Sequence, residues 1–371
     1  MKYYTFLLCL FVSSVLSAQI DFSASTLSGY ESNINKVPEV LEVDGDILER
    51  EDLYMSSAYQ DLILRFKYSK QWNKSSFAAY ITPQIRYYFS EQDANQTILN
   101  TRLTYKYDIR KNFRWENSFQ YKIKDREGQD LDQNELSVPF GYKLLTLNSG
   151  LRFRLYKNNR TFVRLNYGSK EFDNSNSRSV MYNLYGINTE FKNIKWRNHL
   201  LHTYGVRLGY TNRDYNITNF SDGSNSDRTW TYIDAGIFYR LPISKQWYIQ
   251  PELSYQKRTD KTNSVFGYNQ IRPEINISYE SARFEVNFMT SYTSRSFDNL
   301  NASNEDEEVI GNLDYDYWRV RGNVEYIFDK KLSFVLDGYL IDRISNNTDI
   351  TTTAFRSYAN SYIGVGLRYN F

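Results

Sequence analysis

Apolar and polar residues alternate over long stretches of this chain. Between Leu62 and Tyr68, leucine or aromatic side chains occupy every second position, and Arg65 and Lys67 lie between them. Successive side chains of a β-strand point to opposite faces, so this pattern predicts strands with one apolar and one polar face. The same alternation recurs at 77–89, 99–109, 113–123, 200–210, 231–241, 247–255, 271–279, 284–292, 318–328 and 363–371.

Alternating segments of about ten residues are typical of strands that cross a membrane with lipid on one face and a polar lumen on the other. Strands of soluble sandwiches alternate too, but they are usually shorter. A mean hydropathy of -0.62 excludes a bundle of transmembrane helices. An aromatic content of 17% does not suit a disordered chain. The sequence therefore predicts an all-β membrane protein.

The connections between these segments alternate between short and long, as a chain threaded repeatedly through a membrane requires. With both chain ends on the side of the short turns, the count predicts a transmembrane antiparallel up-and-down β-barrel of about 16 strands, with 14 or 18 left open by residues 134–146. The predicted short turns are 70–74, 110–112, 157–160, 193–195, 242–246, 280–282 and 329–331, and the predicted long loops are 32–52, 90–96, 125–134, 173–179, 212–227, 258–264, 297–311 and 345–353.

Tyrosine and tryptophan residues are placed at predicted strand ends, where an amphipathic ring suits the headgroup zone of a membrane. This accounts for much of the excess of tyrosine, 34 residues, without a ligand. The residues predicted for these girdles are Tyr68, Tyr87, Trp115, Trp196, Trp247 and Trp318.

The chain begins with Lys2, an apolar stretch from Thr5 to Leu16, and Ser17-Ala18. A positive start, a short apolar core and small residues at the break predict a secretory signal peptide over residues 1–18. The rest of the chain, 19–371, is then a single barrel domain. The one cysteine, Cys9, is lost with the leader, so the mature protein is expected to carry no thiol chemistry.

The last strand, Ile363 to Phe371, alternates and ends on an aromatic residue. It resembles the C-terminal signal of Gram-negative outer-membrane β-barrels, of a Bacteroidota type. The resemblance implies recognition by the barrel-assembly machinery, an outer-membrane location, and contact with membrane lipid and lipopolysaccharide. A shorter stretch, Gly29-Tyr30-Glu31-Ser32-Asn33, resembles the opening of some export-porin barrels, with Glu31 in place of the usual aspartate.

The polar faces of the predicted strands carry more basic than acidic residues. Rings of arginine and lysine in a pore favour anions. A mixed lining of ion pairs that only solvates the wall is the alternative, since Arg114 with Glu116 and Arg272 with Glu274 are close in sequence. The predicted pore-lining residues are Arg65, Arg86, Arg102, Lys106, Arg114, Glu116, Arg152, Arg154, Arg164, Arg207, Arg272, Glu274, Arg319 and Arg321.

The sequence gives no sign of catalysis. The two histidines, His199 and His202, are three residues apart on one predicted strand and would point to opposite faces, so they cannot share a metal. No nucleophile motif accompanies His199. Acidic clusters at 42–52 and 305–308 lack the spacing of a calcium loop, and solvated loop faces or cation bridges to lipopolysaccharide are the two interpretations. We predict no catalytic residue, metal or cofactor, and the net charge of +2 indicates no nucleic-acid partner.

These features predict an outer-membrane, porin-like channel for the passive or selective diffusion of small polar solutes, with anion preference as the sharper hypothesis. The sequence leaves open whether the lumen is open or plugged, and an inward-folded loop such as 297–311 could constrict or plug it. The alternatives are an export or assembly barrel that acts with a periplasmic partner, and a structural barrel whose surface loops bind ligands.

Overall fold

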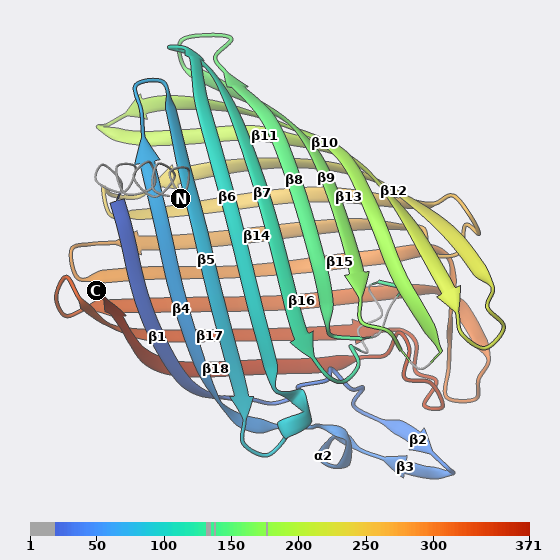
Figure 1. Ribbon diagram of the computed structural model, residues 1–371. Helices are drawn as coiled ribbons and strands as arrows, with labels where there is room; N and C mark the ends of the chain where they lie inside the picture. Colours follow the sequence, from blue (N-terminus) through green and yellow to red (C-terminus); the bar gives the residue numbers. More distant parts are fainter. Residues whose placement is uncertain (1–18, 131–134, 137–138, 176) are drawn as a thin grey trace, which may run out of the picture.

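A computed structural model describes residues 19–130, 135–136, 139–175 and 177–371. Their antiparallel strands form one closed up-and-down barrel of 16 strands, which confirms the predicted fold class and strand count (Figure 1). The predicted signal peptide, 1–18, lies outside the described residues. No helix in the described part of the chain is long and apolar enough to span a membrane.

The barrel strands follow one another around the wall in sequence order. The first strand, β1, pairs with both the second barrel strand and the last one, which closes the barrel. Its strands are β1 (Gln19–Glu31), β4 (Ser57–Gln71), β5 (Ser75–Tyr88), β6 (Gln96–Arg110), β7 (Phe113–Arg126), β8 (Tyr142–Phe153), β9 (Asn159–Phe172), β10 (Arg178–Arg197), β11 (Leu200–Asn219), β12 (Asn225–Pro242), β13 (Trp247–Asp260), β14 (Tyr268–Glu280), β15 (Phe284–Ser303), β16 (Val309–Ile327), β17 (Leu332–Ser345) and β18 (Tyr358–Asn370).

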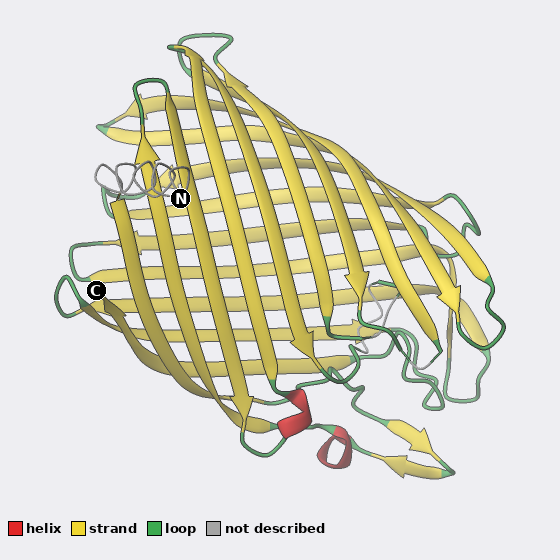
Figure 2. Cartoon of the chain, in the orientation of Figure 1, coloured by secondary structure: helices red, strands yellow, loops and turns green. Residues whose placement is uncertain are grey.

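The two ends of the barrel differ. At one end, here called the turn end, lie short hairpin turns, the start of β1 and the C-terminus (Figure 2). At the other, the loop end, lie the longer connections. They include a small hairpin of β2 (Leu41–Val43) and β3 (Asp46–Leu48), the helix α2 (Arg50–Leu53) and the 3-10 turn η1 (Gln92–Ala94). The hairpin and α2 extend beyond the barrel wall.

Several strands are longer than the sequence pattern predicted. β10 and β11 are 20 residues each, and β10 continues through the expected turn at 193–195. The turn is instead Asn198-His199, whose φ angles of 49° and 61° suit a tight hairpin. The expected loop at 212–227 is reduced to 220–224, and that at 297–311 to 304–308. Polar residues there resembled loops because the outer face of a strand that projects beyond a membrane is wetted.

The outer face of the barrel is a broad apolar belt. Leu165, Leu208, Ile237 and Ile363 are each more than half exposed, and they alternate along their strands with inward-facing polar residues. Soluble monomers rarely expose apolar patches above a few hundred Å². In a closed barrel every strand pairs on both sides, which leaves no unsatisfied edge in lipid. The belt is therefore the membrane-facing surface of a transmembrane β-barrel.

The predicted aromatic girdles are only partly at strand ends. Trp247 begins β13, Trp196 lies one residue before the end of β10, and Trp115 lies near the start of β7. Trp318 instead lies well inside β16, where it packs on Tyr292 with ring centroids 4.9 Å apart. If Trp318 marks the loop-side interface, the first half of β16 projects beyond the membrane.

The seam where β1 meets β18 depends on glycine. A Cβ atom at Gly366 would lie 1.8 Å from the backbone oxygen of Thr26 on β1. At Gly29 and Gly364 the missing side chains make room for the buried ring of Tyr59, whose hydroxyl would lie 2.6 Å and 2.5 Å from the added Cβ atoms. These glycines allow the last strand to approach the first closely enough to close the barrel.

Replacing Gly366 with valine is therefore expected to impair closure. The added side chain must displace backbone rather than a flexible group, and overpacking of this kind costs about 1–3 kcal/mol or more. The folded fraction is measured by the change in gel mobility on heating. A matched control is Gly322→Val on β16, where an added Cβ has open space and the folded fraction should not change. Equal folding of both variants would contradict this account of the seam.

Candidate functional site: the barrel lumen

The structure places every predicted pore-lining residue except Arg154 within a barrel strand. Residues paired across neighbouring strands share a face of the sheet. Arg102 pairs with Gln120, Arg164 with Asn188, and Arg319 with Ser291, and all of these lie opposite to the apolar belt. Arg154 lies just after β8, in the exposed turn to β9, and its side chain is not part of the strand wall.

Ion pairs neutralise about half of the predicted basic wall. Arg114 pairs with Asp108 (2.6 Å) rather than with Glu116, because Asp108 lies directly opposite it on β6. The other pairs are Arg86 with Asp61 and Glu31, Arg152 with Glu116 (3.1 Å), Arg207 with Glu190 (3.1 Å) and Glu252 (2.6 Å), Arg272 with Glu274 (3.8 Å) and Arg321 with Asp337 (4.0 Å). This part of the wall is a mixed lining of paired charges.

The remaining cations have no ion-pair partner among the described residues. Arg164 lies over the ring of Phe162 (4.6 Å from its guanidinium carbon to the centroid), and Arg319 lies over Tyr317 (4.7 Å). Arg65 only donates to the Ser25 hydroxyl (2.8 Å). Cations of the wall without an ion pair include Arg65, Arg102, Lys106, Lys122, Arg164 and Arg319, whereas acids of the wall without one include Asp234, Asp260, Glu280 and Glu285 in the described chain. The wall therefore keeps a positive excess.

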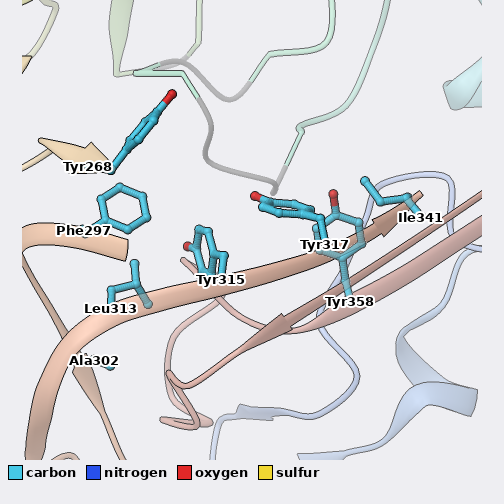
Figure 3. Close-up of a cluster of buried hydrophobic side chains, with 8 residues drawn as sticks. All are labelled: Tyr268, Phe297, Ala302, Leu313, Tyr315, Tyr317, Ile341 and Tyr358. Carbon is cyan, nitrogen blue, oxygen red and sulfur yellow. The ribbon is translucent and has the colours of Figure 1, made fainter. Parts of the chain in front are cut away.

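Toward the loop end, aromatic side chains join buried arginines such as Arg258 and Arg343 on the inward face. Tyr315, Tyr317 and Tyr358 are almost completely buried, and they form a cluster with residues of β14, β15 and β17 (Figure 3). Trp230 and Tyr215 belong to a second cluster of this kind, which centres on β10 to β12. Aromatic residues thus occupy the inward face at the end opposite to the turns.

The sequence interpretation missed these aromatic clusters, although a signal for them is present. In Asp314-Tyr315-Asp316-Tyr317 the aromatic residues alternate with acidic ones, in the phase opposite to the membrane part of β16. Trp318, Val320 and Val324 face outward, whereas Tyr315 and Tyr317 are buried inside. Such an inversion indicates where a strand leaves the membrane and its outer face becomes wet.

Loops from the early part of the chain cover this end of the lumen. Arg126 at the end of β7 donates to the Ile34 carbonyl (2.8 Å) and stacks on Phe140, 3.6 Å from the ring centroid. Lys36 forms an ion pair with Asp130 (2.8 Å), which joins the first long loop to the third. Residues 297–311 do not form the inward-folded loop considered from the sequence, since most of them continue β15 and β16 as a paired hairpin.

The third loop also enters the lumen directly. Glu135 forms ion pairs with Lys170 on β9 (2.6 Å) and Arg213 on β11 (3.4 Å). The ring of Tyr182 also lies under the Arg213 guanidinium, with 4.4 Å to its centroid. This carboxylate binds two basic side chains of the wall near the loop end and neutralises part of their charge.

The two histidines are not a catalytic pair. His199 lies in the exposed turn after β10 and not on a strand, as its φ of 61° shows, so its expected position facing the lumen was wrong. His202 is on the outer face of β11, where its ring nitrogen shares a hydrogen bond with the Tyr239 hydroxyl (2.7 Å). The described part of the chain also contains no group of three residues placed to hold a metal ion.

The fold and the lumen together define a transmembrane β-barrel with a charged interior and a covered loop end. No protein-family model matches the chain, and no curated protein matches it in sequence. Among solved structures, OccAB1 of Acinetobacter baumannii is similar in fold with a TM-score of 0.49 at 10% identity, over 95% of this chain and 97% of that one. OpdQ of Pseudomonas aeruginosa is similar with a TM-score of 0.47 at 11% identity, over 96% of this chain and 98% of that one. The outer membrane channel DcaP of A. baumannii is similar with a TM-score of 0.46 at 12% identity, over 96% of this chain and 98% of that one.

Proposed function

We propose that this protein is an outer-membrane, porin-like channel through which small polar solutes diffuse, with a preference for anions. The observation that carries the proposal is the set of wall cations without ion-pair partners among the described residues, including Arg102, Lys106 and Arg319, which line a barrel of 16 strands. A barrel of this size has room for an aqueous channel. Unpaired cations in its wall raise the local concentration of anions.

The apolar belt and the features of the two chain ends support the proposed location in the outer membrane. Residues 1–18 would direct export, and the turn end would face the periplasm. The C-terminal Phe371 stacks on Phe22 of β1, with ring centroids 4.6 Å apart, and its backbone N–H donates to the Phe22 carbonyl (3.0 Å). Phe371 is therefore well placed on the outer surface, beside the seam, for an assembly machinery to bind it. Membrane lipid and lipopolysaccharide would surround the belt.

The residues that resemble export porins have structural roles here. Gly29 makes room for Tyr59, and Glu31 pairs with Arg86 (2.9 Å). The Asn33 amide donates to the carbonyls of Val37 (2.9 Å) and Ala359 (3.0 Å). No observation on these residues calls for an export partner, and with the two histidines placed as described, we propose no enzymatic activity.

The test is solute uptake by proteoliposomes that contain the purified protein. Small neutral sugars and small organic anions of matched size should both enter, and the anion should enter faster. Raising the salt concentration should remove the difference, because salt screens the charge of the wall. Liposomes with the protein but without any uptake above empty liposomes would contradict the channel. Equal rates for both solutes at low salt would contradict the anion preference alone.

A further inference from the structure

A cavity of about 410 Å³ opens into the lumen between β9 and β14. This volume is in the range of sites for small ligands. Most of its lining residues are polar, and they include Arg164, Asn188, Asp234, Gln256 and Gln270. The wall is hollowed here in part because Gly209 and Gly236 carry no side chains. The cavity is a built feature of the wall rather than a gap between loops.

Most charges in this cavity are already paired. Arg207 is held by Glu190 (3.1 Å) and Glu252 (2.6 Å), and Lys192 beside the cavity takes the other oxygen of Glu190 (2.7 Å). Arg272 is near Glu274 (3.8 Å). The three basic and three acidic side chains named above carry no net charge together and are here called the neutral frame. The specificity of the cavity then depends on the two charged side chains that remain.

Those two charges are Arg164 and Asp234, and neither has an ion-pair partner in the described chain. Asp234 accepts one hydrogen bond from the Gln256 amide (2.7 Å), on a single oxygen. The two residues share one rung of the barrel, because Arg164 pairs with Asn188, Asn188 with Gly209, and Gly209 with Asp234. A cation and an anion outside the neutral frame therefore face the same cavity, three strands apart on one rung.

Their separation defines the length of a ligand. Three strand spacings of about 4.8 Å place the two backbone positions about 14 Å apart along the wall. The side chains reach inward and toward the ligand and shorten the gap. An extended peptide spans about 3.3–3.6 Å per residue, so two or three residues fit between the two charged groups. A free amino acid is too short to bind both.

We propose that this cavity binds a short peptide of two or three residues, with its carboxylate on Arg164 and its ammonium group on Asp234. The glutamine and asparagine side chains of the lining would then bind the peptide backbone, and the neutral frame would accept varied side chains. The inference rests on the proposed channel, since it names one class of solute that would pause in the lumen.

The experiment measures binding of L-alanyl-L-alanine to the full-length barrel in detergent micelles by calorimetry. Loss of either charged contact should weaken binding about tenfold or more. Arg164→Gln and Asp234→Asn should each show this loss, and so should the N-acetylated and the C-amidated peptides with the unaltered protein. The charge-matched controls Lys111→Gln and Asp306→Asn, in exposed turns, should bind as the unaltered protein does.

No binding of the dipeptide would overturn the proposal. So would equal binding of the N-acetylated peptide together with no effect of Asp234→Asn, since the cavity would then be a plain anion site. The blocked peptides test the proposal on the unaltered protein, so a variant that folds poorly does not decide the result. Calorimetry in micelles needs no conduction, so failure of the channel and failure of this site are distinguishable.

Discussion

Replacing Arg86 with alanine is expected to destabilise the barrel by about 3–5 kcal/mol, because the change leaves two buried carboxylates without their cation. Arg86 donates to both oxygens of Asp61 (2.7 and 2.9 Å) and to Glu31 (2.9 Å). All three side chains are largely buried. Its guanidinium carbon also lies 3.9 Å from the ring centroid of Tyr59.

The position of this network explains the size of the expected effect. Glu31 ends β1, Asp61 is on β4 and Arg86 is on β5, so the charges join the strands next to the seam. Glu31 also accepts from the Tyr88 hydroxyl (2.5 Å) and from the Asn360 amide of β18 (3.3 Å). The network thus contacts both β1 and β18, the two strands that meet at the seam. Its loss should lower the free energy of unfolding and speed opening of the seam.

The free energy of unfolding in urea, measured in lipid or detergent, tests this prediction. The matched control is Arg321→Ala, since Arg321 is 60% exposed and is 4.0 Å from Asp337. An exposed pair of this kind contributes little. Replacing Arg86, Glu31 and Asp61 together by neutral residues of similar size should cost less than Arg86→Ala alone, because no buried charge is left unpaired. Equal stability of Arg86→Ala and Arg321→Ala would contradict this account of the network.

Replacing Arg102, Lys106 and Arg319 together by glutamate is expected to reverse the ion selectivity of the channel. These residues lie on β6 and β16 without ion-pair partners in the described chain, so each substitution changes the charge of the wall by two. The ratio of chloride to potassium permeability should fall about tenfold or more, because wall charge sets the local ion concentration. The reversal potential in a salt gradient measures this ratio.

Two further variants separate charge from shape in this experiment. The triple variant that combines R102K, K106R and R319K preserves every charge, and it should keep the selectivity of the unaltered protein. Arg114→Glu should lower the chloride-to-potassium ratio at least as much per residue as the unpaired positions, since it also frees Asp108, which lies 2.6 Å away. An unchanged reversal potential in the triple glutamate variant would show that these residues do not line the conducting path.

The closed barrel could be predicted from the sequence because lipid leaves no room for an unpaired strand edge, and the strand count followed from the number of alternating segments and connections. Every strand in the membrane needs an apolar outer face, so the alternation at Leu62–Tyr68 or 363–371 is nearly unbroken. Outside the membrane this constraint is lost. The polar ends of β11 and β15 therefore resembled loops, although they are paired strands.

The lining residues were predicted by the same alternation, which fixes the face on which a side chain lies but not what it contacts. Arg102 and Arg114 each lie between apolar residues of an alternating segment, yet only Arg114 has an aspartate opposite it across the β6–β7 pair. Cross-strand pairing depends on register, which one strand does not reveal. The contacts of Arg126 with Ile34 and of Glu135 with Lys170 depend on how loops fold over the barrel, which no periodic pattern encodes.

The reversal potential of the unaltered protein in a planar bilayer, under a gradient of potassium chloride, decides whether the barrel is an anion-selective channel. We expect steady single-channel conductance and a reversal potential displaced toward the chloride equilibrium value, with a displacement that shrinks at high salt. No conductance, or a displacement toward the potassium equilibrium value, would contradict it.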